Sequence, residues 1–172
     1  GLLWKNEKEK FSLIATDGRR LAVASTEELN IKKDFKVIVP SKIMNELVKF
    51  IKSAAIGEKE NITVGLSSNQ IGFKAAKTVF ISRLIEGSFP AYEQIIPKNK
   101  EISVEIDAEK LMAVTKRAAI CSTERSGAVK YTFKKDVLVV NSASQTMDFE
   151  DEIEVDHKGK EFQVSFNPKF IL

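Results

Sequence analysis

The chain has 172 residues, 43% of them hydrophobic and 30% charged, and a formal net charge of +3. This composition predicts one large or two small folded domains. It excludes an intrinsically disordered chain and, because no apolar run approaches about 18 residues, a transmembrane helix. Residues 1–98 contain 16 Lys/Arg and 11 Asp/Glu, and residues 99–172 contain 11 and 13, so neither half has the basic excess of a protein that binds nucleic acid tightly.

Strand-like patterns dominate the first half of the chain. Two apolar runs, residues 11–15 and 21–25, flank residues 16–20, which read TDGRR. The Asp-Gly pair predicts a hairpin turn there, because glycine accepts a positive φ without steric strain. Alternating and β-branched residues predict further strands at 35–39, 61–66, 70–75 and 78–86, with a turn at 68–69.

Two segments have helical spacing instead. We expect one helix between residues 41 and 52, capped by Ser41, and another between 107 and 120, capped by Asp107. An apolar stripe on each helix predicts the face that packs against a sheet. The stripes consist of Ile43, Met44, Leu47, Val48 and Ile51 in the first helix, and of Leu111, Val114, Thr115, Ala118 and Ala119 in the second.

The second half otherwise reads as strands. They are predicted at 101–106, 129–133, 137–142, 145–155 and 161–166, with a hairpin turn at 134–136. His157 is expected at the tip of a hairpin between the last two strands. The alternating acidic residues between 148 and 156 are expected on a solvated sheet edge, where charge opposes aggregation.

A strand, a capping residue and a helix start recur at 37–42, 104–109 and 164–169. The caps are Ser41, Asp107 and Asn167, which lie 66 and 60 residues apart, and Pro168 suits the first position of the third helix. The repeat predicts an α+β fold, in which strand–helix–strands units form antiparallel sheets with one helix per unit on one face. Because the first and last units are incomplete, we expect the chain to be cut at both ends.

Four motifs resemble the bacterial DNA polymerase sliding clamp. Residues 14–23, IATDGRRLAV, are similar to the ATDGHRLA signature of the clamp's middle domain, and residues 37–42, VIVPSK, are similar to the strand and helix start that follow it. Residues 84–92, LIEGSFPAY, resemble the L-x-G-x-F-P-x-Y crossing toward the third domain. Residues 117–122, RAAICS, resemble RAAILS on that domain's first helix. The motifs occur in family order over nearly the whole chain.

The resemblance implies a DNA clamp fold, with residues 1–97 as the later part of the middle domain and 98–172 as the first half of the third. Members of this family form a head-to-tail homodimeric ring of six similar domains, with helices lining the hole around duplex DNA. The implied function is that of a processivity factor, a non-catalytic subunit of the replicative DNA polymerase III holoenzyme. The implied location is the cytoplasm, at the nucleoid, and no cofactor is implied.

The resemblance also implies a groove in which the clamp loader, polymerases and repair proteins dock a short extended peptide. Leu21, Pro90 and Ile95 would form its apolar floor, while the Thr16 hydroxyl and Arg20 guanidinium could hydrogen-bond the peptide or an amide. Arg19 stands where the signature often has His, and Gln94 where some members have a basic residue, so both bear on peptide specificity. The predicted groove residues are Thr16, Gly18, Arg19, Arg20, Leu21, Pro90, Gln94 and Ile95. Without the resemblance, a simple turn is the alternative.

The resemblance implies that one side of each helix faces DNA. Lys42, Lys49 and Lys52 lie on the first helix, and Lys110, Lys116 and Arg117 on the second. Contacts between such side chains and phosphate carry no base information and have the same energy at each register, so they permit sliding. Among these cations, Glu46 and Glu109 would moderate the attraction. A solvated helix face is the alternative that the residues alone favour.

Few residues suggest catalysis. Cys121 and His157 could formally pair as a thiol and its base, which leaves a cysteine hydrolase as an alternative function. One histidine and one cysteine cannot build a metal cluster, and the chain has no Gly-rich phosphate loop and no Cys-x-x-Cys, so no cofactor or metal is expected. The single cysteine and the absence of a signal-peptide pattern at the first residues favour a reducing, intracellular setting.

A third alternative is a β-rich interaction module unrelated to DNA. The helical repeat with its basic side weighs against this alternative.

Overall fold

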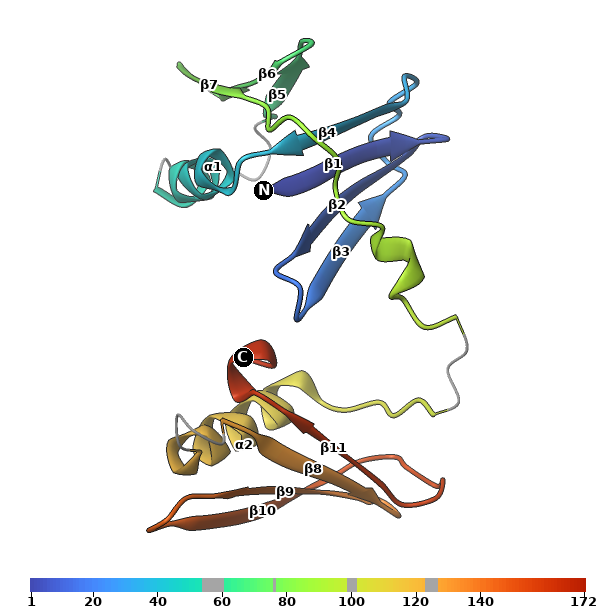
Figure 1. Ribbon diagram of the computed structural model, residues 1–172, viewed down its shortest axis with the longest axis vertical. Coiled ribbons are helices and arrows are strands. Elements are labelled where there is room, and N and C mark those ends of the chain that lie inside the picture. The colour runs from blue at the N-terminus through green and yellow to red at the C-terminus, as the bar shows by residue number, and fades with distance from the viewer. Residues whose placement is uncertain (54–60, 76, 99–101, 123–126) are drawn as a thin grey trace. The chain divides into compact units, whose positions relative to one another are not determined.

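The computed structural model describes residues 1–53, 61–75, 77–98, 102–122 and 127–172. The chain divides into two compact units, Gly1–Ile96 and Pro97–Leu172. Within the described residues, the first unit contains two antiparallel sheets and the second contains one, and each unit has one α-helix (Figure 1).

Four strands of the first unit form an antiparallel sheet. They are β1 (Leu2–Glu7), β2 (Lys10–Thr16), β3 (Leu21–Thr26) and β4 (Phe35–Val39), in the order β3-β2-β1-β4. The hairpin between β2 and β3 is the one predicted around the Asp-Gly pair. Gly18 has a φ of 84°, the positive value for which a glycine is favoured.

The register of this sheet assigns its side chains to two faces. Leu3 lies opposite Ile14 on β2 and Ile38 on β4, so these three side chains share one face, here called the outer face. Trp4 is the next residue along β1, and it therefore points to the opposite face together with its partners Leu13 and Val37.

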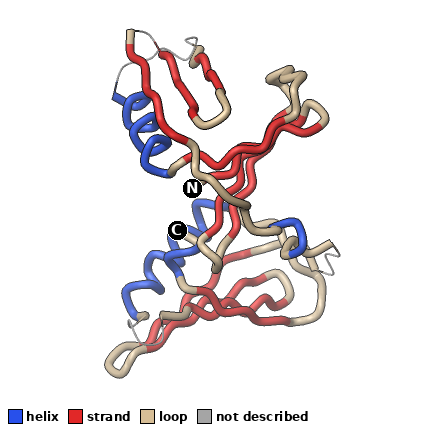
Figure 2. The backbone as a smooth tube through the Cα atoms, turned by 45° about the horizontal axis from the view of Figure 1, so that its top comes forward, coloured by secondary structure: helices blue, strands red, loops and turns tan. Residues whose placement is uncertain are grey.

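The face around Trp4 packs against a helix and a second sheet. The helix is α1 (Ser41–Ser53), and the sheet contains β5 (Thr63–Leu66), β6 (Gln70–Ala75) and β7 (Thr78–Arg83), in that order (Figure 2). Trp4, Phe11, Leu47 and Phe73 are buried together at this junction. The Trp4 ring lies edge-on to Phe11 and Phe73, with centroid distances of 5.3 and 5.7 Å. This edge-to-face geometry is favourable for aromatic rings.

The apolar face of α1 differs from the predicted stripe. Leu47 is buried as predicted, but Val48 and Ile51 are 43% and 37% exposed. Val48 lies about 100° around the helix from Leu47, beyond the core-facing row. Phe50 is half-buried instead, and its ring centroid lies 5.1 Å from that of Phe80 on β7.

The second unit packs α2 (Ala108–Cys121) against a four-stranded antiparallel sheet. Its strands are β8 (Val129–Lys134), β9 (Val137–Ala143), β10 (Asp148–Glu154) and β11 (Phe162–Phe166), in the order β10-β9-β8-β11. Val114 and Ala118 of α2 are fully buried against the sheet. Asp107 caps the helix as predicted, because its Oδ1 accepts a hydrogen bond from the Lys110 backbone N–H at 2.9 Å.

The predicted strands that differ from the structure include those at 101–106 and 78–86. Residues 102–106 contain no strand, since Glu105 makes only an isolated bridge to Asp156, and residue 101 lies outside the described residues. The strand predicted at 78–86 ends at Arg83. The backbone N–H of Ile85 then donates to the Ile38 carbonyl at 2.8 Å, so this segment leaves the second sheet and crosses to β4 of the first.

The two four-stranded sheets share one arrangement. In each, the strand that precedes the next helix start, β4 or β11, returns to pair with the first strand, β1 or β8. Asn167 follows β11 and accepts a hydrogen bond from the Lys169 N–H at 3.0 Å, and Pro168 begins the short 3-10 helix η2 (Pro168–Phe170). The predicted α+β fold, with antiparallel sheets and repeated strand–helix–strands units, is confirmed.

Candidate partner groove and nucleic-acid face

The turn between β2 and β3 is closed by its own side chains. The Thr16 hydroxyl donates to the Arg20 carbonyl at 2.8 Å and accepts from the Gly18 N–H at 3.1 Å. Asp17 Oδ1 accepts from the backbone N–H groups of Arg19 and Arg20, each at 3.1 Å, and Asp17 Oδ2 accepts from Arg20 Nε at 3.0 Å. The Arg19 and Arg20 amides are the main reason that the pKa of Asp17 lies below its ordinary value. The two groups predicted to hydrogen-bond a peptide are therefore already bonded within the turn.

Leu21, the first residue of β3, lies beside an apolar cluster on the outer face of the sheet. Leu3, Ile14 and Tyr92 are its buried members, and Leu21 and Phe89 are half-buried against them. The register explains this position, because Leu21 lies opposite Thr16 at the end of the hairpin, next to the Ile14 pair. Leu21 is thus partly covered by its own chain and partly open.

The segment after β7 supplies the other predicted groove residues. Pro90, Gln94 and Ile95 are exposed, Ile95 by 64%. Gln94 belongs to the 3-10 helix η1 (Tyr92–Gln94), and the Tyr92 N–H at its start donates to the Pro90 carbonyl at 2.8 Å. Burial of the Tyr92 ring, which raises the pKa of its hydroxyl, fixes this short helix on the sheet.

An ion pair also fastens η1 to the outer face. Lys5 Nζ lies 2.7 Å from Glu7 Oε2 on the same strand and 3.6 Å from Glu93 Oε1 on η1. The hydrogen bond to Glu7 is the largest cause of the raised pKa of Lys5. Sequence reasoning did not single out Phe89, Tyr92 or this ion pair as site features, although the aromatic spacing in FPAY could have indicated the first two.

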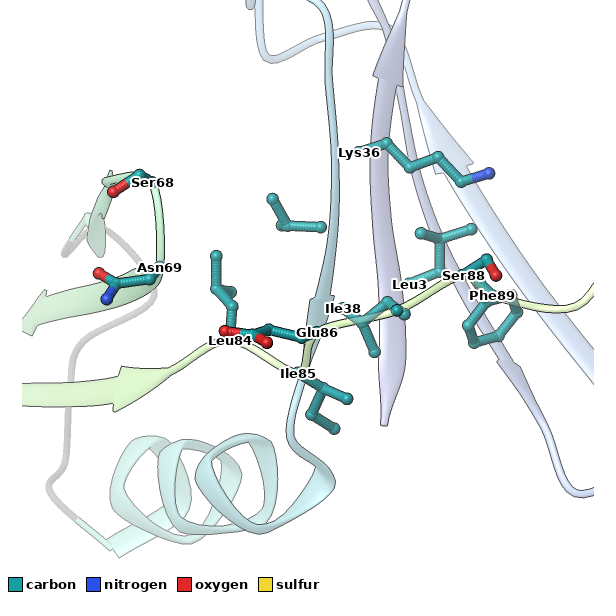
Figure 3. A pocket seen from close by; sticks show the side chains of 12 residues that line it. Leu3, Lys36, Ile38, Ser68, Asn69, Leu84, Ile85, Glu86, Ser88 and Phe89 are labelled. Carbon is teal, nitrogen blue, oxygen red and sulfur yellow. The ribbon is translucent and has the colours of Figure 1, made fainter.

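A cleft of about 430 Å³ adjoins the apolar cluster (Figure 3). Leu3, Ile38 and Phe89 contribute to both features. The crossing segment closes one side of the cleft, where the Leu84 N–H donates to the Asn69 carbonyl at 2.8 Å. None of the eight predicted groove residues lines this cleft.

The side chains predicted to face DNA are all exposed, but two of them form ion pairs with carboxylates of this chain. On α1, Lys49 Nζ lies 3.1 Å from Glu46 Oε1, one turn away. On α2, the Arg117 guanidinium pairs with Asp151 on β10, with Nε 3.1 Å from Oδ2. The exposed members also include Lys42, Lys52, Lys110 and Lys116.

The acidic run lies where it was predicted. β10 is an edge strand of its sheet, and its residues alternate between exposed carboxylates, such as Glu150 and Glu152, and the half-buried Phe149 and Ile153. Over the described ranges, no group of three or more possible metal-ligating side chains occurs. Within the same ranges, no helix is long and apolar enough to cross a membrane.

His157 is not at a hairpin tip. β10 and β11 occupy opposite edges of their sheet, so the segment between them crosses the sheet instead of turning back. His157 is 3% exposed, packs edge-on to Phe133 and Phe162, and places Nε2 3.1 Å from the Lys160 carbonyl oxygen. Cys121, the last residue of α2, is half-buried. His157 is thus accounted for as part of the packing of the sheet.

The repeated units, each carrying one helix over antiparallel strands, define a DNA clamp fold. The family model for the DNA polymerase III beta subunit, central domain, matches residues 1–91, and that for the beta subunit, C-terminal domain, matches residues 93–172. The chain therefore belongs to the DNA polymerase III beta subunit family, and the resemblance of its motifs is confirmed.

Individual relatives agree with this assignment. The beta sliding clamp of Haemophilus influenzae is 32% identical over 173 residues, and that of Staphylococcus aureus 30% over 175 residues. The chain is covered completely in both comparisons but spans only 46% and 45% of those relatives. A DNA polymerase sliding clamp from Pseudomonas aeruginosa superposes with a TM-score of 0.90 at 25% identity, covering 99% of this chain and 47% of that one.

Proposed function

We propose that the protein is a processivity factor of DNA replication, a ring that encircles duplex DNA and tethers a polymerase to it. The observation that carries this proposal is the match of two successive clamp domains, over residues 1–91 and 93–172. Residues 1–97 would be the later part of the middle domain and residues 98–172 the first half of the third. Because the chain spans about half of its relatives, the ring itself is the property of the longer protein, a head-to-tail homodimer.

The partner site in this proposal is the apolar strip formed by Leu21, Pro90 and Ile95. Two of these residues are exposed, and the third is half-buried on a cluster that η1 fixes in place. An extended peptide from the polymerase, the clamp loader or a repair protein would place apolar side chains on this strip. A ligand has been seen on a family member, since a Pseudomonas aeruginosa sliding clamp was crystallised with griselimycin bound.

The DNA contact in this proposal is weak and independent of base sequence. Exposed lysines on α1 and α2 supply positive charge without a groove-reading element. Enclosure by the ring, and not affinity, would hold the protein on DNA. The protein would have no chemistry of its own and would act in the cytoplasm, at the nucleoid.

Two measurements on the full-length protein test this function. Its size in solution should be that of a dimer, and it should lengthen the products that a replicative polymerase makes in one binding event. A strict monomer that leaves product length unchanged would refute the proposal.

The enzyme alternative predicts a different result. If the protein were a cysteine hydrolase, an activity present in the native protein would vanish in Cys121→Ala. We expect Cys121→Ala to lengthen polymerase products as the native protein does, because no step of a clamp requires the thiol.

A further inference from the structure

Arg117 is the cation of α2 that is most constrained by a neighbouring element. Its guanidinium donates from both Nε and Nη2 to Asp151 Oδ2. Asp151 is held in turn, because its Oδ1 accepts the Glu152 backbone N–H at 2.8 Å. The Arg117 and Asp151 side chains keep exposures of 50% and 34%, so solvent and solutes can reach this pair.

The position of Asp151 on β10 determines which way its carboxylate points. Side chains alternate along a strand, and Phe149 and Ile153 on the same face pack into the core beneath α2. Asp151 therefore points toward the helix, whereas Glu150 and Glu152 point to the opposite face. On α2, Arg117 precedes the buried Ala118 and lies on the flank of the helix nearest this strand.

We infer that Asp151 is an affinity-setting residue, which holds the Arg117 guanidinium and thereby weakens the contact of α2 with DNA phosphates. The inference rests on the proposed function, since it assumes that α2 faces DNA. A guanidinium that is bonded to a carboxylate must share or leave that carboxylate before it can bind a phosphate. The carboxylate also repels the phosphate directly.

Weakness of this contact has a functional use. Each cation that binds a phosphate deepens the energy minimum at one register of the ring and raises the barrier to the next. With Asp151 in place, Arg117 steers the polyanion without becoming a strong ligand. Among the described residues, no carboxylate forms an ion pair with Lys110 or Lys116, the other two exposed cations of α2.

The test compares Asp151→Asn with Glu152→Gln in the full-length protein. Both variants remove one negative charge at neighbouring positions of β10, but only the first removes the carboxylate charge that pairs with Arg117. Binding to a short duplex is measured from low to moderate salt, together with the diffusion coefficient of the loaded ring along linear DNA. We expect Asp151→Asn to bind about 1.5-fold to 5-fold more tightly than Glu152→Gln, the range expected for one exposed ion pair. For Asp151→Asn, the slope of log affinity for DNA against log salt concentration should steepen by up to about 0.9. The diffusion of the loaded variant ring along DNA should slow.

A double variant removes the general effect of charge. In an Arg117→Ala background, Asp151→Asn and Glu152→Gln should bind DNA equally, because no guanidinium remains to be freed. Equal binding of the two carboxylate variants with Arg117 present would overturn the inference. Failure of the native ring to engage DNA at all would instead refute the proposed function, so the two failures are distinguishable. Melting temperatures of all variants identify any that fail to fold, and Asp151→Ala then replaces Asp151→Asn.

Discussion

At the scale of single residues, the polar groups of the 16–21 turn are committed to the turn itself. Thr16, Asp17 and Arg20 are joined by hydrogen bonds of 2.8 to 3.1 Å, so a peptide would have to compete with them. Peptide affinity should therefore come mainly from the apolar strip. Each methylene group removed from water contributes about 0.8 kcal/mol, whereas exchanging one hydrogen bond for another contributes little net free energy.

Leu21→Glu should abolish binding of a peptide that contains Gln and Leu or Phe, because a carboxylate would be desolvated against an apolar side chain. The fold should survive, with a loss of about 1–2 kcal/mol, since Leu21 is only half-buried. Val23→Glu, on the same strand and 47% exposed, is the matched control and should retain binding. Peptide affinity and melting temperature are measured for both. Retained binding in Leu21→Glu would remove Leu21 from the groove, and collapse of the fold would assign it to the core.

The Asp17 carboxylate should make the stability of the turn dependent on pH. Its folded pKa lies below the ordinary value of 3.8, chiefly because of the Arg19 and Arg20 amides. A depressed folded pKa stabilises the fold above the unfolded pKa, and this contribution is lost as pH falls through the folded pKa. The melting temperature of the native protein should exceed that of Asp17→Asn at pH 5 to 7, and the difference should shrink below about pH 4. A melting-temperature difference between the two proteins that stays constant across this pH range would contradict the stabilising role of the Asp17 carboxylate.

At the scale of elements, local signals in the sequence predicted the Asp107 and Asn167 caps and the Asp-Gly turn. Asp107, Asn167 and the Asp-Gly turn act through side chains and φ angles within three residues, so their geometry is encoded locally. Tertiary packing decided the rest. Phe50 replaces Val48 and Ile51 on the core side of α1 because Phe80 on β7 offers a ring surface, and no local pattern reveals that partner.

The same distinction applies to the candidate site. Exposure of Pro90 and Ile95 follows from their place in a crossing segment, which the motif predicted. The apolar cluster of Leu3, Ile14 and Tyr92 depends on sheet register and on η1 folding back. His157 was predicted at a hairpin tip because the sequence does not reveal that β10 and β11 lie at opposite edges of the sheet.

Removal of the α2 cap should weaken the second unit. Asp107→Ala deletes the acceptor for the Lys110 N–H, and such losses are worth about 0.5–2 kcal/mol of unfolding free energy. Chemical denaturation measures the change. Glu109→Ala, a substitution in the same first turn that leaves the cap intact, should have a smaller effect. Equal destabilisation by the two substitutions would mean that the cap contributes nothing specific.

At the scale of the whole molecule, charge is spread thinly. The net charge is only +3, and the second half of the chain has more acidic than basic residues. Enclosure of DNA is compatible with such a surface, whereas tight and sequence-specific binding is not. Binding that persists at high salt on one particular sequence would contradict a sliding ring.

Individual lysines on the helices should contribute to the salt dependence of DNA binding. Lys116→Gln in the full-length protein should flatten the log–log salt slope by up to about 0.9, the value for one phosphate contact. Lys135→Gln is the control, because Lys135 is an exposed cation in the turn between β8 and β9, away from α2. The slope should not change in Lys135→Gln. Equal flattening by both substitutions would indicate a diffuse charge effect and remove α2 from the DNA-facing surface.

The return of β4 and β11 to the first strand of their sheets also sets an order of folding. The β8–β9 and β9–β10 hairpins close short loops, whereas β11 must bring residue 166 opposite residue 129. Loop-closure entropy rises with the length of the loop, so the hairpins can form early and β11 last. The strand that completes each sheet is also the one that leads into the next helix. Each four-stranded sheet is therefore completed by the last of its strands to leave the ribosome.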